Sequence, residues 1–261
     1  MLFDKMPSRV GRQDNPMLAL AANTHPSGAY RTQLSADWES FYAAKRSSST
    51  RRRDRSKRKK LAEFGAVRLD NPQTREQALR MAETLIAQKE AAFARMGVTN
   101  IFARPGYRGF FLDIASGERT RGFAHVSGLM VGDTVAATNL GLCFRGTYYH
   151  VLASYDDGPV SRFGPGAAHL HDLMQYAIAC DCTVFDFTIG DEPYKRDWCD
   201  EEMTLYDHVS GAGLRGHAIA GAVNAARGAK RAIKQSPVLW PVVLKVRTMV
   251  AALRKGTPSV E

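Results

Sequence analysis

Three consecutive segments with a two-residue alternation of apolar and polar side chains constrain the fold more than any other feature. Residues 123–131, 134–144 and 147–155 each predict a β-strand. Gly132–Asp133 and Arg145–Gly146 separate them, and connections this short join strands that are antiparallel neighbours. The middle of the chain is therefore predicted to form an antiparallel meander of three strands.

A helix and another strand are predicted after the meander. A loop rich in Gly and Pro over residues 156–166 leads into Ala167–Cys180, where apolar residues recur at helical spacing. An apolar strand over residues 183–189 follows. A strand–helix–strand step is right-handed and makes its two strands parallel. We expect an α/β (α+β) fold with a mixed sheet, in which the antiparallel meander is followed by a crossover helix and a parallel strand, with helices on both faces.

The remaining segments alternate between helical and extended patterns. Asp37 can cap a helix on which Trp38, Phe41 and Tyr42 share one face. That helix is expected to continue to Gly65. Further helices are expected from the capping box Thr74–Gln77 to Gly97, over 107–116, and over 212–256 with a break at Ser236–Pro237, the last of them basic. Further strands are expected over 64–69 and 203–209.

These patterns predict three regions. Residues 1–36 should be loop or the remnant of a preceding unit, residues 37–210 one catalytic domain that begins with a basic helix, and residues 211–261 a C-terminal basic helical extension. The start of the chain has no secretory signal pattern, and Val238–Leu244 is too short to span a bilayer. We therefore expect no transmembrane segment and a cytoplasmic location, with a membrane-peripheral one as the alternative.

Four cysteines form no CxxC pair and are too few for a disulfide framework, so reduced packing thiols and no metal are expected. The net charge of +10 is concentrated between Lys45 and Lys60, where ten Lys and Arg residues accompany a single acid, Asp54. A solvated helix face is one interpretation. The others are contact with tRNA or an anionic membrane, and binding of a phosphate-rich ligand such as coenzyme A.

The loop before the crossover helix is the first candidate site. It reads Ser161-Arg162-Phe163-Gly164-Pro165-Gly166-Ala167. The glycines allow the backbone to approach a ligand, and a helix amino end offers N–H groups and a positive dipole end. A pyrophosphate would fit there, and Arg162, Gly164, Gly166 and Ala167 are the candidate ligand-binding residues. An ordinary flexible loop with a helix cap is the alternative.

The second candidate is the strand that carries Asp186, together with the turn beyond it. Asp186 should lie on a covered face of the strand, and a buried carboxylate needs a partner, which Lys195 could supply. A structural ion pair is one interpretation. In the other, Asp186 acts as a base or orients the acceptor, while Lys195 stabilises developing negative charge. Tyr194 is the third candidate catalytic residue.

These motifs carry a resemblance to a known family. The run FGPGAAHLHDLMQYAIACDCTVFDFTIGDEPYKRDW resembles the signature of GNAT-superfamily acetyltransferases of the CelD/BcsL type, which are associated with cellulose and exopolysaccharide synthesis. The match covers roughly residues 38 to 235, and the family is similar to the Fem-type aminoacyl transferases. Ser161 departs from the general pattern of the GNAT loop, in which Arg or Gln is expected.

The resemblance implies an acyltransferase that uses acetyl-CoA or another acyl-CoA. It implies donor binding around Gly164–Ala167, roles for Asp186, Tyr194 and Lys195, and an amine or hydroxyl acceptor such as a saccharide precursor. Two alternatives remain open. One is a Fem-like transferase that uses aminoacyl-tRNA, which the basic run favours. The other is a non-catalytic GNAT scaffold, which Ser161 favours.

Overall fold

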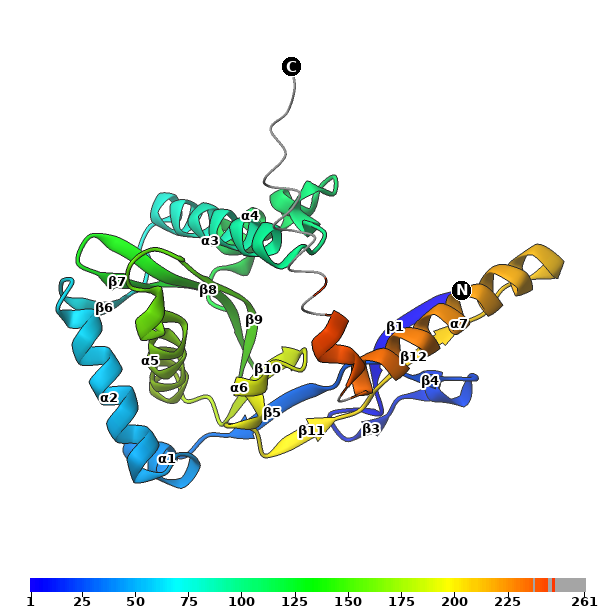
Figure 1. Ribbon diagram of the computed structural model, residues 1–261, viewed down its shortest axis with the longest axis horizontal. Helices are drawn as coiled ribbons and strands as arrows, with labels where there is room; N and C mark the ends of the chain where they lie inside the picture. Colours follow the sequence, from blue (N-terminus) through cyan, green and yellow to red (C-terminus); the bar gives the residue numbers. More distant parts are fainter. Residues whose placement is uncertain (237, 244–245, 247–261) are drawn as a thin grey trace, which may run out of the picture. The chain divides into compact units, whose positions relative to one another are not determined.

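The computed structural model describes residues 1–236, 238–243 and 246, and it divides into two compact units (Figure 1). The larger unit contains residues 32–188. The smaller unit contains residues 1–31 together with the described residues from Ile189 onward. Each unit is described by itself below.

A mixed sheet forms the centre of the larger unit. Its strands are β6 (Val67–Asp70), β7 (Ala124–Val131), β8 (Thr134–Phe144), β9 (Thr147–Tyr155) and β10 (Val184–Ile189), in the spatial order β10-β9-β8-β7-β6, with β5 (Ala29–Gln33) next to β10. Strands β6 to β9 are antiparallel neighbours, whereas β10 pairs parallel with β9. The predicted meander and the parallel strand are both confirmed.

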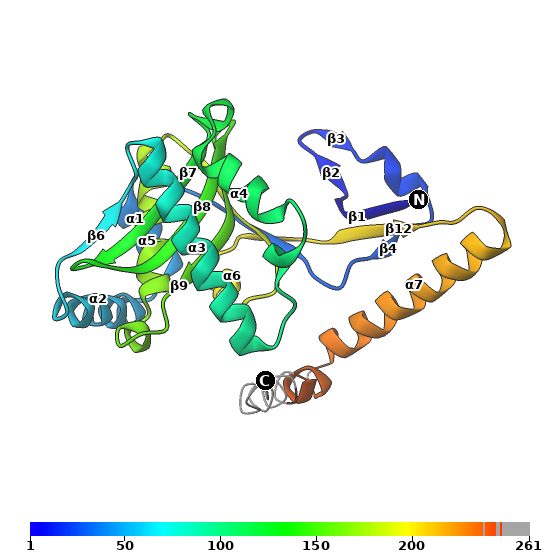
Figure 2. The same cartoon turned by 90° about the horizontal axis from the view of Figure 1, so that it is seen from above.

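Helices cover both faces of this sheet (Figures 1 and 2). The helices α3 (Arg75–Met96) and α4 (Tyr107–Ser116) pack on one face, and α5 (Pro165–Ala179) packs on the other. The buried side chains Leu85 and Ile86 of α3 join Leu140 and Leu152 of the sheet in one apolar cluster. The capping box at Thr74 begins α3, as the sequence predicts. Short 3-10 turns, η2 (Ile101–Ala103) and η3 (Glu118–Thr120), flank α4.

The basic run lies on a helix of its own, so the prediction of one continuous helix from Asp37 to Gly65 is wrong. Instead α1 (Trp38–Lys45) ends at Arg46, whose backbone is extended, and α2 (Ser48–Ala62) begins after Ser47. The Ser47 hydroxyl accepts a hydrogen bond from the Thr50 N–H, a bond that stabilises a new helix start and competes with helix continuation. The break makes α1 and α2 two distinct helices.

The smaller unit contains strands where the sequence predicts loop. Residues 1–36 contain β1 (Leu2–Pro7), β2 (Arg9–Val10), β3 (Gln13–Asp14), β4 (Asn23–Thr24), β5 and the 3-10 turn η1 (Pro16–Ala19), so the expectation of a loop is wrong. Several of these strands have only two residues, too few to show a periodicity. The single strand expected over 203–209 is divided into β11 (Glu201–Met203), which pairs with β5, and β12 (Leu205–Val209), which lies between β1 and β4.

Two labelled helices belong to the smaller unit. They are α6 (Pro193–Arg196) and α7 (Gly213–Gln235), and α7 confirms the first of the expected C-terminal helices. Residues 239–243, beyond the break at Ser236, are also helical. Pro237, residues 244–245 and residues 247–261, on which part of that prediction falls, lie outside the described residues. In the described part of the chain, no helix has the length and apolar character needed to cross a bilayer. The boundaries at 36/37 and 210/211 remain predictions.

Candidate functional site

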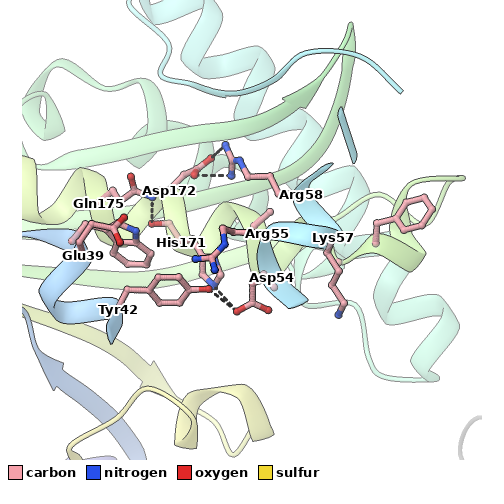
Figure 3. A pocket seen from close by; sticks show the side chains of 14 residues that line it. Glu39, Tyr42, Asp54, Arg55, Lys57, Arg58, His171, Asp172 and Gln175 are labelled. Atoms are coloured by element: carbon pink, nitrogen blue, oxygen red, sulfur yellow. Dashed lines mark hydrogen bonds and ion pairs between the residues drawn. The ribbon is translucent and has the colours of Figure 1, made fainter. Parts of the chain in front are cut away.

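A cavity of about 260 Å³ opens in the larger unit between α1, α2 and α5 (Figure 3). The 3-10 turn η4 (Ser161–Phe163) borders it where the predicted glycine loop enters α5. Gly164 and Ala167, two of the four predicted ligand-binding residues, line this cavity.

Gly164 forms the amino end of α5 in a left-handed conformation, with φ +70°. An ideal Cβ placed on it would lie 3.9 Å from the Nζ of Lys57, so the ammonium group of α2 stands directly over the glycine backbone. The positive end of the α5 dipole and this ammonium group both favour an anion at the same place. The structure thus brings together the glycine loop and the basic run, which the sequence shows only as separate features.

Two further cations flank the loop through the ring of Phe163. The guanidinium carbon of Arg162 lies 4.8 Å from the ring centroid, and the Nζ of Lys60 lies 5.8 Å from it. Arg162 and Gly166 are not among the residues that line the cavity. Gly166 faces the opposite way, since a Cβ on it would lie 3.4 Å from the ring of Tyr155. These two predicted residues therefore adjoin the cavity without lining it.

The helix α2 is anchored to α5 and to the core. Arg58 donates from Nη1 to Oδ1 of Asp172 over 2.9 Å and from Nη2 to Oδ2 over 3.1 Å. Leu61 is fully buried in a cluster with Leu129 and Val131. Burial raises the pKa of Asp172, and the guanidinium opposes that shift. The paired groups fix the helix and thereby fix the position of Lys57.

Aromatic rings and a carboxylate occupy the other end of the cavity. The ring of Tyr42 stacks on Trp38 with centroids 4.8 Å apart, and His171 lies 5.2 Å from Tyr42. The Tyr42 hydroxyl donates to Oδ2 of Asp54 over 2.8 Å, and the Nε2 of His171 lies 4.0 Å from the same oxygen. Burial lowers the pKa of His171 to about 4, against the pull of Asp54, so its ring is neutral at pH 7.

Sequence reasoning missed most of this end. Trp38 and Tyr42 are visible in the sequence only as an apolar helix face, and His171 alone carries no signal. Asp54 gives a usable signal, since it is the single acid within the basic run. A lone carboxylate among ten cations indicates a specific partner, which the structure identifies as Tyr42.

A second cavity of about 600 Å³ lies beside the amino end of α3 and the start of β7. His125 lines it, with Nε2 3.0 Å from Oδ1 of Asn71 and Nδ1 2.8 Å from the Tyr148 hydroxyl. The side-chain amide of Asn139 donates a hydrogen bond to the Tyr148 hydroxyl. That hydroxyl can therefore donate its own proton to Nδ1 of His125. Burial lowers the pKa of His125 to about 4. His125, Asn71 and the Tyr148 hydroxyl satisfy one another, whereas the buried Oδ1 of Asn139 has no hydrogen-bond partner in the described structure.

Asp186, the first predicted catalytic residue, is half-buried on β10. Its Oδ1 accepts a hydrogen bond of 2.7 Å from the N–H of Thr188, which has a positive φ of 57°. The backbone ladder with β9 runs from Val184 to Asp186, and beyond it the Thr188 hydroxyl donates to the His150 carbonyl over 3.2 Å. On β9, a bulge at Val151 lies just beyond this point. Asp186 therefore stands at the end of the backbone ladder between β9 and β10.

Lys195 and Tyr194 belong to α6 of the smaller unit. Lys195 is 4% exposed, and its Nζ donates to the Ile189 carbonyl over 2.9 Å and pairs with Glu192 at 2.9 Å. Tyr194 is exposed over 37% of its surface. Lys195 is thus held inside its own unit and is not a solvated surface lysine.

Three residues of metal-ligating type form a cluster in the smaller unit. They are Asp4, His25 and Asp207, and their ligand atoms lie within 4.8 Å of one another. Arg227 already bridges the two carboxylates, with Nη1 2.7 Å from Oδ2 of Asp207 and 3.0 Å from Oδ1 of Asp4. A cation would have to displace this guanidinium group, so the arrangement is explained as an ion-pair cluster.

Comparisons with known proteins identify a family for this chain and solved structures of similar fold. Residues 48–196 match the family model described as Acetyltransferase (GNAT) domain. Among solved structures, FemX aligns with 73% of this chain and 66% of its own, slightly less than two thirds of its length, at 10% identity and a TM-score of 0.53. No curated protein sequence matches the chain.

Two other solved structures are also similar. L-PGS from Bacillus licheniformis aligns over 88% of this chain and 74% of its own, at 10% identity and a TM-score of 0.53. The C-terminal domain of a putative lysylphosphatidylglycerol synthetase from Agrobacterium fabrum aligns over 85% and 71%, at 12% identity and a TM-score of 0.51. At these identities the similarity shows a shared fold.

Proposed function

We infer that this chain, which belongs to the acetyltransferase (GNAT) family, transfers an acyl group from a phosphate-bearing donor to an amine or hydroxyl. The observation that carries the proposal is the position of the Lys57 ammonium over Gly164, at the positive end of the α5 dipole. Cations and N–H groups that converge on one backbone position are what a diphosphate requires.

The donor is proposed to be acetyl-CoA or another acyl-CoA, with its pyrophosphate at Gly164 and Ala167 and its thioester toward the end of the backbone ladder between β9 and β10. The acceptor nitrogen or oxygen attacks the thioester carbonyl carbon. The carbon–sulfur bond then breaks, and the thiolate leaves with the electron pair. Positioning the two reactants and polarising the carbonyl supply the acceleration, without a covalent enzyme intermediate.

Asp186 is proposed as the base that takes the acceptor proton, because its half-buried carboxylate stands at the end of the backbone ladder between β9 and β10. For Lys195 we propose stabilisation of negative charge in the transition state, and for Tyr194 a contact with the acceptor. A buried lysine with a backbone partner suits such a role, because its charge is held in a fixed place.

The sequence motif supports finer proposals about the biological setting. Its resemblance to the CelD/BcsL type favours a saccharide precursor of an exopolysaccharide as the acceptor. We propose a cytoplasmic enzyme that can contact anionic membrane through the exposed cations of α2.

Calorimetric titration with acetyl-CoA tests the donor. We expect saturable binding that coenzyme A competes for, and a Lys57→Ala variant that binds at least about tenfold more weakly, since a charge-assisted hydrogen bond contributes about 1.5–3 kcal/mol. Arg53→Ala is the matched control, because Arg53 is an exposed cation of the same helix that does not line the cavity. Absence of heat and of competition would exclude acyl-CoA.

A second donor, aminoacyl-tRNA, is supported by the exposed cations of α2 and by the structural similarity to FemX. Binding of tRNA should then weaken steeply with salt, and should weaken further when Arg51, Arg52 and Arg53 are all changed to Ala. Binding that ignores salt would count against this donor. The non-catalytic alternative predicts that Asp186→Asn and Lys195→Ala leave cellular function intact.

A further inference from the structure

The long helix α7 of the smaller unit turns charged side chains toward its own unit and apolar side chains toward solvent (Figure 2). Arg227 pairs with both Asp4 and Asp207, and Lys234 pairs with Asp191. A surface helix of a globular protein usually has the reverse arrangement, with its apolar stripe against the core and its charges in water. An extended apolar face in solvent indicates a surface that binds a partner.

The outer face of α7 is apolar along its whole length. Leu214 is exposed over 93% of its surface and Ile219 over 66%, and Ile233 is exposed as well. At about 3.6 residues per turn, the exposed apolar positions cover about half of the helix circumference. The other exposed positions between 214 and 233 are alanine or glycine, apart from three polar ones, which are Arg215, His217 and Lys230.

The described residues that follow α7 add to this surface. Val238, Leu239 and Val242 are exposed. The ring centroid of Trp240 lies 5.9 Å from the Nζ of Lys234, so a cation–π contact joins this segment to α7. Tryptophan is enriched where proteins meet the boundary between lipid and water.

The charge of α7 distinguishes between the partners that could cover this face. The helix contains five Lys and Arg residues and no Asp or Glu. A second copy of α7 would bring like charges together without an acid to pair with them. An anionic lipid surface supplies hydrocarbon for the apolar face and also phosphate groups for Arg215 and Lys230.

We propose that α7 lies in the interface of an anionic bilayer, with Leu214 and Ile219 among the acyl chains and Arg215 and Lys230 at the headgroups. This contact is separate from the donor site and does not depend on the transferase proposal. It also differs from a contact through the cations of α2, since the one large apolar side chain of that helix, Leu61, is buried.

Sedimentation of the full chain with lipid vesicles is the test. We expect vesicles that contain phosphatidylserine to bind at least about tenfold more strongly than pure phosphatidylcholine at low salt. Changing Leu214 and Ile219 together to Gln should weaken this binding about tenfold or more, because two large apolar side chains no longer enter the lipid. Ala225→Leu, at an exposed position of the same face, should strengthen it at least about threefold.

Phe110→Gln is the matched control, since Phe110 is an exposed apolar side chain of the larger unit and its loss should leave vesicle binding unchanged. Equal binding to both kinds of vesicle, or no binding to either, overturns the proposal. Unchanged affinity of Ala225→Leu also overturns it, and this variant decides the question if the double Gln variant does not fold. Self-association that the double variant abolishes, without vesicle binding, would assign the face to a second copy instead.

Discussion

Arg58 holds Asp172 through two parallel hydrogen bonds of 2.9 and 3.1 Å, and this pair joins α2 to α5. The carboxylate is mostly buried, with 10% of its side-chain surface exposed. Arg58→Ala would leave it without its partner, and we expect a loss of about 2 kcal/mol in the free energy of unfolding. Arg58→Lys should recover only part, because an ammonium group cannot form both bonds in one plane.

Urea denaturation measures this loss, with Arg52→Ala as the control. Arg52 is an exposed cation of the same helix, so its replacement should change stability by no more than about 0.5 kcal/mol. An Arg58→Ala protein as stable as the control would show that the pair does not anchor α2.

The two glycines of the loop should respond in opposite ways to a methyl group. Gly164→Ala forces a left-handed backbone on an L-residue and should cost about 1–2 kcal/mol of stability. Gly166→Ala lies within α5, where its methyl group would meet the Tyr155 ring at an ordinary contact distance, and it should add about 0.5–1 kcal/mol. The urea denaturation midpoints of the Gly164→Ala and Gly166→Ala variants measure these two changes in stability. Midpoints that shift in the same direction would contradict the prediction.

Asp186→Asn separates charge from shape. The amide oxygen can still accept the hydrogen bond from Thr188 N–H, so stability should stay within about 1 kcal/mol of the wild type. If the carboxylate is the base, turnover should fall about 100-fold or more. The release of free thiol from acetyl-CoA reports the rate. Full activity of the Asp186→Asn variant would show that another group acts as the base.

Stability should fall when the pH drops below about 6.5, because buried histidines must stay neutral in the folded state. The pKa of His125 is about 4 in the folded protein, whereas an unfolded histidine has a pKa of about 6.5. Between these values the unfolded state binds a proton that the folded state does not. Each such histidine therefore removes up to about 1.4 kcal/mol of stability per pH unit as the pH falls, and the loss levels off near pH 4.

Denaturant titrations between pH 7 and 4 measure that slope. His125→Asn should make it shallower, whereas His217→Asn, at an exposed position on α7, should leave it unchanged. Equal slopes in wild type and His125→Asn would show that His125 is protonated in the folded protein.

The central sheet is predictable because local patterns determine it. The bounds of β8 and β9 match the predicted segments, because the alternation of apolar and polar residues identifies both strands. The Arg145–Gly146 turn marks the end of β8 and the start of β9. The start of α5 is missed by two residues, because Pro165 and Gly166 resemble loop, although proline suits the first helical position. The short strands of residues 1–36 are held by distant partners, such as β12 for β1, which no local pattern reveals.

The part of the candidate site that lies in one contiguous motif was predictable, and the part that depends on distant contacts was not. Gly164 and Ala167 belong to a contiguous motif, and both line the cavity, whereas Arg162 and Gly166 of the same motif do not. The contribution of Lys57 depends on how α2 folds back onto α5, which follows from the break at Ser47 and the pair between Arg58 and Asp172. A basic run in a sequence does not show which of its members faces a ligand. The assignments of Asp186, Lys195 and Tyr194 stay predictions.

The anchoring of α2 has a consequence for how quickly and selectively an anion is captured. Because Leu61 and Arg58 immobilise the helix before any ligand arrives, only the four-carbon stem of Lys57 remains to be ordered. Such a preformed cradle loses little conformational freedom on association, so it can bind a diphosphate without waiting for a segment to fold around it.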